Sequence, residues 1–276
     1  MKILVFGSTG LLGNHLNPSL KKNNYDIFTI GRSKECDYIV DLKNSKLISL
    51  HIEKVKPDVI INLIAMTNVD ECEENKEKCS HLHIGIPKVI VKSVEMIENY
   101  QPHLIHISSD QVYSGNGPHL EINPNPVNVY GMTKLKGESI FDAMPSTVIR
   151  TNFFGKSLIS KRKSFTDWLF NSAKTKESIT VFNDVFFNPL SIRSLCSIIQ
   201  TIIERKVLGV YNIGSKGVIS KADFALEFTK TLGISASHIK IGKISDVYLM
   251  AMRPNDMTMD CSKIESKLSI KLPNIK

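Results

Sequence analysis

Cysteine is scarce in this sequence, and the few cysteines present are not paired. Among 276 residues there are five, with no Cys-x-x-Cys pair and no cysteine–histidine spacing typical of a metal site. They are Cys36, Cys72, Cys79, Cys196 and Cys261. An odd number of widely spaced cysteines argues against a disulfide framework and against a zinc site. We therefore expect reduced thiols, no bound metal and a cytoplasmic location.

Long apolar runs and clusters of one charge are also missing. No stretch approaches the roughly 20 apolar residues of a membrane-spanning helix, and the opening MKILVFGSTG is a short apolar run broken at Gly7, unlike a signal peptide. The net charge is +8, but the densest basic run, 161–163, holds only three residues. A nucleic-acid-binding face needs clustered basic side chains. We expect neither a membrane nor a nucleic acid as partner, whereas an anionic small substrate agrees with the sign of the charge.

A glycine-rich turn near the N-terminus is the first positive signal. An apolar run, Lys2 to Phe6, is followed by GSTGLLG and then by a helical pattern through Leu20. Strand, glycine turn and helix in this order are typical of the opening of a dinucleotide-binding unit, although the spacing here is G-x-x-G-x-x-G. The helix N-terminus would offer free N–H groups to a pyrophosphate. The residues expected to contact it are Gly7, Ser8, Gly10, Leu11, Leu12 and Gly13.

The second predicted strand, Asp26 to Ile30, bears on the choice of cofactor. NAD sites use an acidic residue after this strand to bind the adenosine ribose, and none is present. Arg32 could instead pair with a 2′-phosphate, which favours NADPH and leaves NADH as the alternative. An exposed arginine in a turn explains Arg32 equally well. A third short strand, Tyr38 to Val40, places Asp41 and Leu42 near the adenine.

A near-continuous apolar strand is predicted from Asp58 to Ile64. Its carboxyl end is where open α/β sheets bind ligands, so Leu63, Ala65 and Met66 are candidates for cofactor contact. A mostly helical stretch follows from Leu82 to Tyr100. His81 and His83 have no metal-like companions, and we interpret them as ordinary polar positions of that helix.

The central stretch contains the candidate catalytic residues. A strand, Leu104 to Ile107, ends in two serines, and Tyr130 and Lys134 stand four apart in a helix predicted from Val129 to Phe141. Residues i and i+4 share one helix face, and a lysine ammonium near a phenol lowers its pKa. Tyr130 is thus a candidate proton donor, and Ser109 could hold a carbonyl. Alone, a Y-x-x-x-K match is weak.

Strands and helices alternate along the chain, which predicts an α/β fold with a right-handed, doubly wound parallel sheet of Rossmann type. We assign residues 1–155 to an NAD(P)-binding domain, with 184–214 returning to it. Residues 156–183 and 215–276 are expected to form a smaller C-terminal α/β lobe that binds substrate. Within that lobe, Ser220 can cap a helix with Asp223 at its third position.

With these features combined, the chain resembles the extended short-chain dehydrogenase/reductases, and more narrowly the dTDP-4-dehydrorhamnose reductase group. The resemblance covers nearly the whole chain. It rests on FGSTGLLG, KPDVIINLIAMTNVDECE, SSDQVYSGNG, PVNVYGMTKLKGE, VIRTNFFG, FNDVFFNPL, GVYNIGS and MRPNDM. It implies NAD(P)H-dependent reduction of the C4 ketone of a nucleotide-linked 4-keto-6-deoxy sugar, in deoxysugar and cell-surface polysaccharide biosynthesis. Tyr130 would be the acid, Lys134 its pKa-lowering and ribose-binding partner, and Ser109 the group that polarises the ketone.

The same resemblance implies a set of substrate contacts. Besides Ser109 and Tyr130 they are Thr67, Val69, Asp70, Asp110, Gln111, Phe153 and Arg253, of which Arg253 would pair with a phosphate, although an ordinary surface arginine is an equal alternative. The chain departs from the family at Met66, where His is usual, at Phe153, where Trp is usual, and at His83, where Asn is usual. The family also includes dimers that are linked by a metal ion. For this chain we expect no metal, and a homodimer is one option.

Three alternatives remain at this stage. A dehydratase of the same fold would need a second carboxylate where Gln111 stands. A combined epimerase–reductase would need a Cys/His pair, and the sequence places no cysteine near Ser109. A non-catalytic, nucleotide-binding regulatory subunit would be signalled by loss of Tyr130 or Lys134, and both are present.

Overall fold

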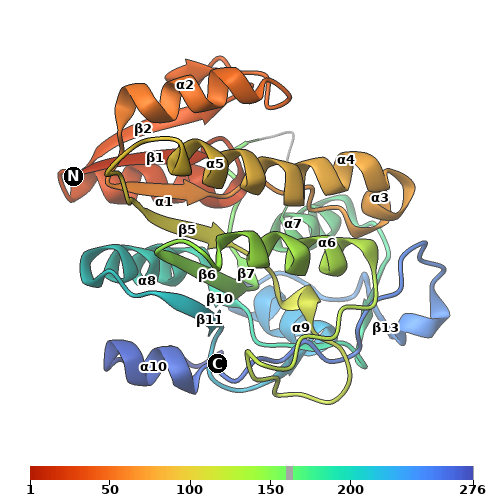
Figure 1. Cartoon of the computed structure of the whole chain (residues 1–276). Coiled ribbons are helices and arrows are strands. Elements are labelled where there is room, and N and C mark those ends of the chain that lie inside the picture. The colour runs from red at the N-terminus through yellow and green to blue at the C-terminus, as the bar shows by residue number, and fades with distance from the viewer. Residues whose placement is uncertain (160–163, 276) are drawn as a thin grey trace.

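A seven-stranded parallel sheet forms the centre of the computed structural model, which describes residues 1–159 and 164–275 (Figure 1). The strand order is β11-β6-β5-β4-β1-β2-β3. The strands are β1 (Lys2–Phe6), β2 (Asp26–Gly31), β3 (Tyr38–Ile39), β4 (Val59–Asn62), β5 (His103–Ile107), β6 (Ser146–Thr151) and β11 (Gly209–Ile213). The inner strands are buried on both faces, which explains their near-continuous apolar sequence.

The strand order reverses between β1 and β4, because the chain runs outward from β1 to β3 and then in the other direction from β4 to β11. The predicted doubly wound parallel sheet is therefore confirmed. In such sheets the crevice beyond the carboxyl ends of the strands, at the point of reversal, is where ligands bind.

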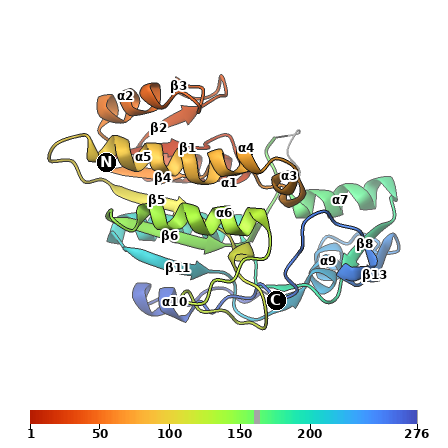
Figure 2. The same cartoon turned by 45° about the vertical axis from the view of Figure 1, so that its right-hand side comes forward.

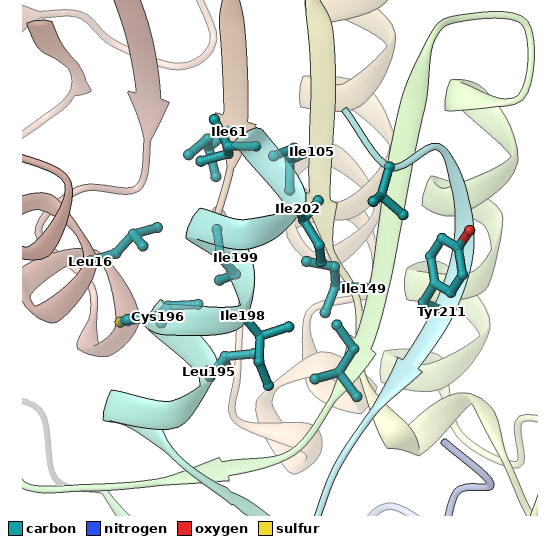
Figure 3. Packing of buried hydrophobic residues seen from close by; sticks show 14 of the residues in the cluster. Leu16, Ile61, Ile105, Ile149, Leu195, Cys196, Ile198, Ile199, Ile202 and Tyr211 are labelled. Atoms are coloured by element: carbon teal, nitrogen blue, oxygen red, sulfur yellow. The ribbon is translucent and has the colours of Figure 1, made fainter. Parts of the chain in front are cut away.

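Helices cover both faces of this sheet. One face carries α1 (Leu11–Lys22), α8 (Ile192–Arg205) and α10 (Ser262–Leu268), and the other carries α2 (Ser45–Val55), α5 (Ile86–Glu95) and α6 (Val129–Glu138). The apolar residues of α8 recur at helical spacing and form one buried stripe. Figure 3 shows Leu195, Ile199 and Ile202 of α8 packed among side chains of the sheet and of α1. Each such side chain contributes about 1.5–3 kcal/mol on burial.

A second, smaller core lies beside the carboxyl ends of the sheet strands (Figure 2). Its elements are β7 (Phe153–Phe154), α7 (Phe165–Thr175), β8 (Ile179–Phe182), β9 (Phe186–Phe187), β10 (Leu190–Ser191), β12 (Ile219–Ser220), α9 (Lys221–Thr231) and β13 (Ile239–Gly242). β8 pairs with β13, β9 with β12, and β7 with β10. The Ser220 side chain accepts the Asp223 N–H, so the predicted cap of α9 is confirmed.

The segment after β4 is more broken than expected. It contains α3 (Val69–Glu74), α4 (Lys76–Ser80) and a π-helical turn (His81–Gly85) that leads into α5. The helix predicted to reach Tyr100 ends at Glu95, followed by a turn. Three short 3-10 turns complete the described elements: Asp110–Val112, Ser139–Phe141 and Ile244–Asp246. Across the described ranges, no helix is both long and apolar enough to cross a membrane.

Candidate active site

The turn between β1 and α1 leaves its backbone open to a ligand. Gly7 has a φ of +80°, in the left-handed region that favours glycine. A Cβ on Gly13 would overlap the Ser8 carbonyl oxygen, so only glycine lets α1 pack this closely. Gly10 precedes α1 without a side-chain cap, and the first turn of α1 contains no acidic residue. The free N–H groups and the positive end of the helix dipole therefore fit a dinucleotide pyrophosphate.

The other predicted cofactor residues surround this turn to different degrees. Backbone atoms of Leu63 lie against Gly7, which brings the loop after β4, with Ala65 and Met66, to the turn. Leu12 and Leu42 are buried in the core, whereas Leu11 is partly buried. Asp41 is exposed and accepts the Lys43 N–H at 3.0 Å.

The end of β2 offers an exposed cation, and the acidic residues of the connection to β3, Glu35 and Asp37, come later along the chain. Arg32 is exposed directly after β2. The carboxylate of Asp37, in the connection to β3, is held by hydrogen bonds. It accepts the Thr29 N–H at 2.8 Å and the Thr29 hydroxyl at 2.7 Å. This carboxylate holds the strand edge and is not free for a ribose.

Two close backbone contacts bring Tyr130 and Lys134 to the end of β5. Asn128 caps α6 by accepting the Gly131 N–H at 2.8 Å. A Cβ on Gly131 would overlap the Gln111 carbonyl oxygen, so α6 lies directly against the turn that begins after Ser109. Ser109, Tyr130 and Lys134 are all buried here, as the predicted catalytic group requires.

Tyr130 differs from the sequence expectation in the direction of its pKa shift. We expected Lys134 to lower it, but burial raises the pKa of Tyr130 above its ordinary value, and a hydrogen bond with Ser109 only partly opposes this. The spacing argument identified a nearby cation but could not account for desolvation. Lys134 donates to the Ile107 carbonyl at 2.6 Å, and burial lowers its pKa to about 8. Tyr130 thus carries its proton near neutral pH.

Asp110 fixes the hydroxyl of Ser109. The hydroxyl donates to Asp110 Oδ1 at 3.1 Å, and Asn152 donates to Asp110 Oδ2 at 2.6 Å. Burial raises the pKa of Asp110, while the Lys221 ammonium acts in the opposite direction. The buried Asp110 carboxylate therefore orients the Ser109 hydroxyl and does not face an open cavity.

His83 belongs to the site, and its interpretation as an ordinary helix position is wrong. The side chain is fully buried and packs edge-on against the Tyr130 ring, with centroids 5.4 Å apart. Its Nε2 accepts the Met66 N–H at 3.0 Å, so the proton lies on Nδ1, 2.8 Å from the Thr133 hydroxyl. Burial lowers the pKa of His83, which keeps it neutral. His83 thus connects the loop after β4 to α6.

Cys79 lies beside His83, a contact that the sequence analysis did not anticipate. Its Sγ is 3.4 Å from His83 Nδ1 and 3.2 Å from the Thr133 hydroxyl. Both side chains of this cysteine–histidine pair have no exposed surface, and they lie with Tyr130 in one small buried cluster. The pair therefore lies where a substrate cannot reach it.

Two of the predicted substrate residues meet each other. Arg253 donates to Asp70 Oδ2 at 2.8 Å and to the Ala251 carbonyl at 2.9 Å, while Asp70 Oδ1 accepts the Ala251 N–H at 2.9 Å. These contacts lower the pKa of Asp70 against the raising effect of burial. Thr67 is exposed and Val69 begins α3. The contacts join the loop after β4 to the C-terminal part of the chain.

A pocket of about 330 Å³ lies between these residues and the smaller core. Gln111 lines it on the side of Ser109, and Phe165 and Trp168 line it from α7. Lys221 and Arg253 are its charged residues, and Lys221 was not among the predicted site residues because its sequence context indicated only a helix cap. Phe153, which was predicted to contact substrate, is partly buried and packs against the core of the main sheet.

The whole sequence matches one known protein family. Residues 1–276 match the family described as RmlD substrate binding domain. The chain belongs to this family. Among RmlD relatives, dTDP-4-dehydrorhamnose reductase of Shigella flexneri is 28% identical over 289 residues, covering 99% of this chain and 94% of that protein. Methionine adenosyltransferase 2 subunit beta of Rattus norvegicus is 25% identical over 277 residues, covering 96% of this chain and 82% of that protein.

The RmlD fold is also recovered in solved structures. A dTDP-4-dehydrorhamnose reductase from Bacillus anthracis, crystallised in complex with NADP, aligns with a TM-score of 0.89 over 99% of this chain and 95% of that one. At 21% identity this likeness concerns the fold alone. The resemblance inferred from the sequence motifs is thus confirmed at the level of the family.

Proposed function

We propose that this RmlD family member is an NADPH-dependent oxidoreductase that reduces the C4 ketone of a nucleotide-linked 4-keto-6-deoxy sugar, in deoxysugar biosynthesis. The observation that carries the proposal is the convergence of Ser109, Tyr130 and Lys134 at the carboxyl end of β5, at the same edge of the sheet as the open glycine turn before α1. The reductase relative covers nearly the same length of chain, which supports the same reaction.

The chain's own residues can carry the proton side of this reaction. When bound, NADPH supplies the hydride. Tyr130, which carries its proton near neutral pH, would donate it to the oxygen of the ketone. The Ser109 hydroxyl, which in this structure donates to Asp110, would turn to donate its one hydrogen bond to the same oxygen, where negative charge develops. Lys134 donates a hydrogen bond to the Ile107 carbonyl and so places a positive charge at the end of β5, near Ser109.

The substrate would extend from the catalytic residues into the pocket. Gln111 is adjacent to Ser109 along the chain and also lines the pocket, so a sugar at Ser109 would have its nucleotide between Phe165, Trp168 and Arg253. The loop Thr67 to Asp70 would contact the sugar. We propose that residues 1–155 with 184–214 bind the cofactor, and that 156–183 with 215–276 bind the substrate. A cytoplasmic protein agrees with five free cysteines.

Other functions of the fold are less well supported. A dehydratase lacks its second carboxylate, since Gln111 follows Asp110. An epimerase would need an acid–base pair that the substrate can reach. Cys79 and His83 are fully buried, and His83 packs against the Tyr130 ring. The relative named as a methionine adenosyltransferase subunit favours a regulatory role as the second candidate. The buried catalytic group argues for the reductase, because a purely regulatory subunit has no need of it.

Oxidation of NADPH in the presence of a panel of nucleotide 4-keto-6-deoxy sugars tests the proposal. Tyr130→Phe removes only the proton donor, so kcat should fall by about 10²-fold or more while the cofactor still binds in a direct titration. Wild type should prefer NADPH to NADH, and Arg32→Ala should reduce that preference. Turnover by Tyr130→Phe at the wild-type rate would reject Tyr130 as the proton donor. No turnover by wild type on any member of the panel would reject the reductase.

A further inference from the structure

Lys221 occupies an unusual position on the wall of the substrate pocket. It follows the two-residue strand β12 and begins α9, and its N–H donates to the Val185 carbonyl at 2.9 Å. This fixes the residue at the pocket, where both Val185 and Lys221 are lining residues. Its ammonium lies 3.4 Å from the centroid of the Phe187 ring and 5.0 Å from that of Phe165. The aromatic faces hold the ammonium group in place.

The charge of Lys221 has no close counterion. Within residues 1–159 and 164–275, no carboxylate oxygen lies within 4.0 Å of its ammonium. Asp110 is the acidic group whose charge acts on it, but the oxygens of Asp110 accept from Ser109 and Asn152. The other pocket cation, Arg253, is already paired with Asp70 at 2.8 Å. A partly buried, uncompensated cation is costly unless an anion joins it.

The position of Lys221 agrees with the layout of a nucleotide-linked sugar. The charge of Lys221 acts on Asp110 and lowers the pKa of that carboxyl group. Asp110 is next to Ser109, the residue at which the ketone would be reduced. Also in the pocket are Phe165 and Trp168, whose stacked rings, 5.8 Å apart, give the pocket an apolar wall suited to a base. In such a substrate the diphosphate joins the sugar to the nucleoside. A cation that lines the same pocket as Gln111 and these two rings is therefore suited to bind the diphosphate.

We propose that Lys221 binds the diphosphate of the substrate and is the residue by which this enzyme selects nucleotide-linked sugars. This inference rests on the proposed reductase function and specifies how its substrate is recognised. It assigns the main phosphate contact to Lys221 rather than to Arg253. Of these two pocket cations, Arg253 pairs with Asp70, whereas Lys221 forms no ion pair within the described residues. Arg253 then serves chiefly to hold Asp70.

Calorimetric titration of the full chain with dTDP and with thymidine tests the assignment. Lys221→Met keeps the length of the side chain and removes the charge, so dTDP affinity should fall by about tenfold or more, the scale for a lost charged hydrogen bond. Thymidine has no phosphate, and its affinity should change less than about twofold. Lys221→Arg should retain most of the affinity for dTDP. Lys174→Met is the matched control, since Lys174 also rests on an aromatic ring, that of Phe170, but does not line the pocket.

The outcomes separate this inference from the reductase function. If Lys221→Met binds dTDP as wild type does, or loses thymidine and dTDP binding equally, the assignment of Lys221 is overturned while the reductase function stands. If wild type itself binds no dTDP and reduces no nucleotide 4-keto sugar, both are overturned. A loss of dTDP affinity confined to Lys221→Met, with arginine restoring it, supports the assignment.

Discussion

Tyr130 illustrates how strongly burial controls the chemistry of a single residue. Desolvation raises the pKa of its phenol, although Lys134 lies four residues away on the same helix. A protonated tyrosine is the form needed to reduce a ketone, since the proton must be present when charge develops on the oxygen. In the opposite direction, oxidation of an alcohol, the same group would first have to lose its proton. A raised pKa also makes the phenol a weaker acid, so the shift does not by itself favour reduction.

The pair of Asp70 and Arg253 gives a prediction at the residue scale. If the arginine mainly holds the loop after β4, Asp70→Asn and Arg253→Ala should raise KM by similar factors, because each removes the same 2.8 Å ion pair. If the guanidinium also contacts phosphate directly, only Arg253→Ala should add a further loss of about tenfold or more in dTDP affinity. Steady-state kinetics and titration of both variants decide between them. An unchanged KM in both would remove the pair from the site.

Local spacing was sufficient to predict some of these residues but not others. The glycine turn, Ser109 and the Tyr130–Lys134 pair are each visible within a few neighbouring positions. His83 was misinterpreted because its partners, the Met66 N–H and the Thr133 hydroxyl, come from separate segments. Lys221 was missed for the same reason: its aromatic partners, and the lack of an ion pair with any carboxylate of the described residues, are properties of the folded chain only.

At the scale of elements, α6 is fitted against its neighbours through two glycines. A Cβ on Gly131 would overlap the Gln111 carbonyl oxygen, and one on Gly137 would overlap the His83 carbonyl oxygen. Gly131→Ala and Gly137→Ala should each destabilise the protein by about 1–3 kcal/mol through overpacking. Gly131→Ala should also lower kcat, because it displaces the helix turn that carries Tyr130. Urea unfolding and steady-state assays measure both effects.

Lys136→Ala is the control for these glycine variants, because Lys136 is exposed on the same helix. It should leave both stability and kcat nearly unchanged. A Gly131→Ala protein with full stability and full activity would show that α6 can move without disturbing the site, contrary to this account.

The helices and strands were predicted well where one periodicity dominated. β1, for example, matches its predicted range, Lys2–Phe6, and α1 follows the glycine turn as predicted. The π-helical turn at His81–Gly85 could not be predicted from local sequence. In this turn His83 contacts the Met66 N–H of the loop after β4 and the Thr133 hydroxyl of α6, and neither partner is near it in the sequence. Such turns often occur at functional sites, and here the turn places the neutral imidazole of His83 against the ring of Tyr130.

On the scale of the whole molecule, buried histidines make the fold sensitive to acid. Burial lowers the pKa of His103 from 6.5 to about 4, and it lowers the pKa of His83 and His106 as well. Below pH 6.5 the unfolded chain therefore binds protons that the folded chain does not. The free energy of unfolding should fall as pH drops from about 6.5 to about 4, by about 1.4 kcal/mol per pH unit for each such histidine.

His103→Gln should reduce this slope by one histidine's share in urea unfolding curves recorded across that pH range. Thr147→Val is the control, since it removes the hydroxyl that contacts His103 Nε2 at 2.7 Å but no titrating group. It should lower stability by a similar amount at every pH. An unchanged slope in His103→Gln would mean that the imidazole is charged in the folded protein.

The main sheet and its topology followed from the alternation of strands and helices, because each element buries its own apolar stripe. How the chain folds back is less apparent from the sequence. After Thr151 it leaves the sheet, builds part of the smaller core, and returns only at Gly209 to lay β11 beside β6. Contacts over such separations, like that between Arg253 and Asp70, have no local signal.

This return has a consequence for the chain during its synthesis. β6 emerges from the ribosome well before β11, the strand that covers its open side. At about 5–20 residues per second, that edge waits for several seconds with Val148 and Ile149 lacking the cover of β11 and α8. An uncovered edge strand is a template for pairing with other chains. In the interval between β6 and β11 the nascent protein is thus exposed to aggregation at this edge, although Ser109, Tyr130 and Lys134 have already been synthesised.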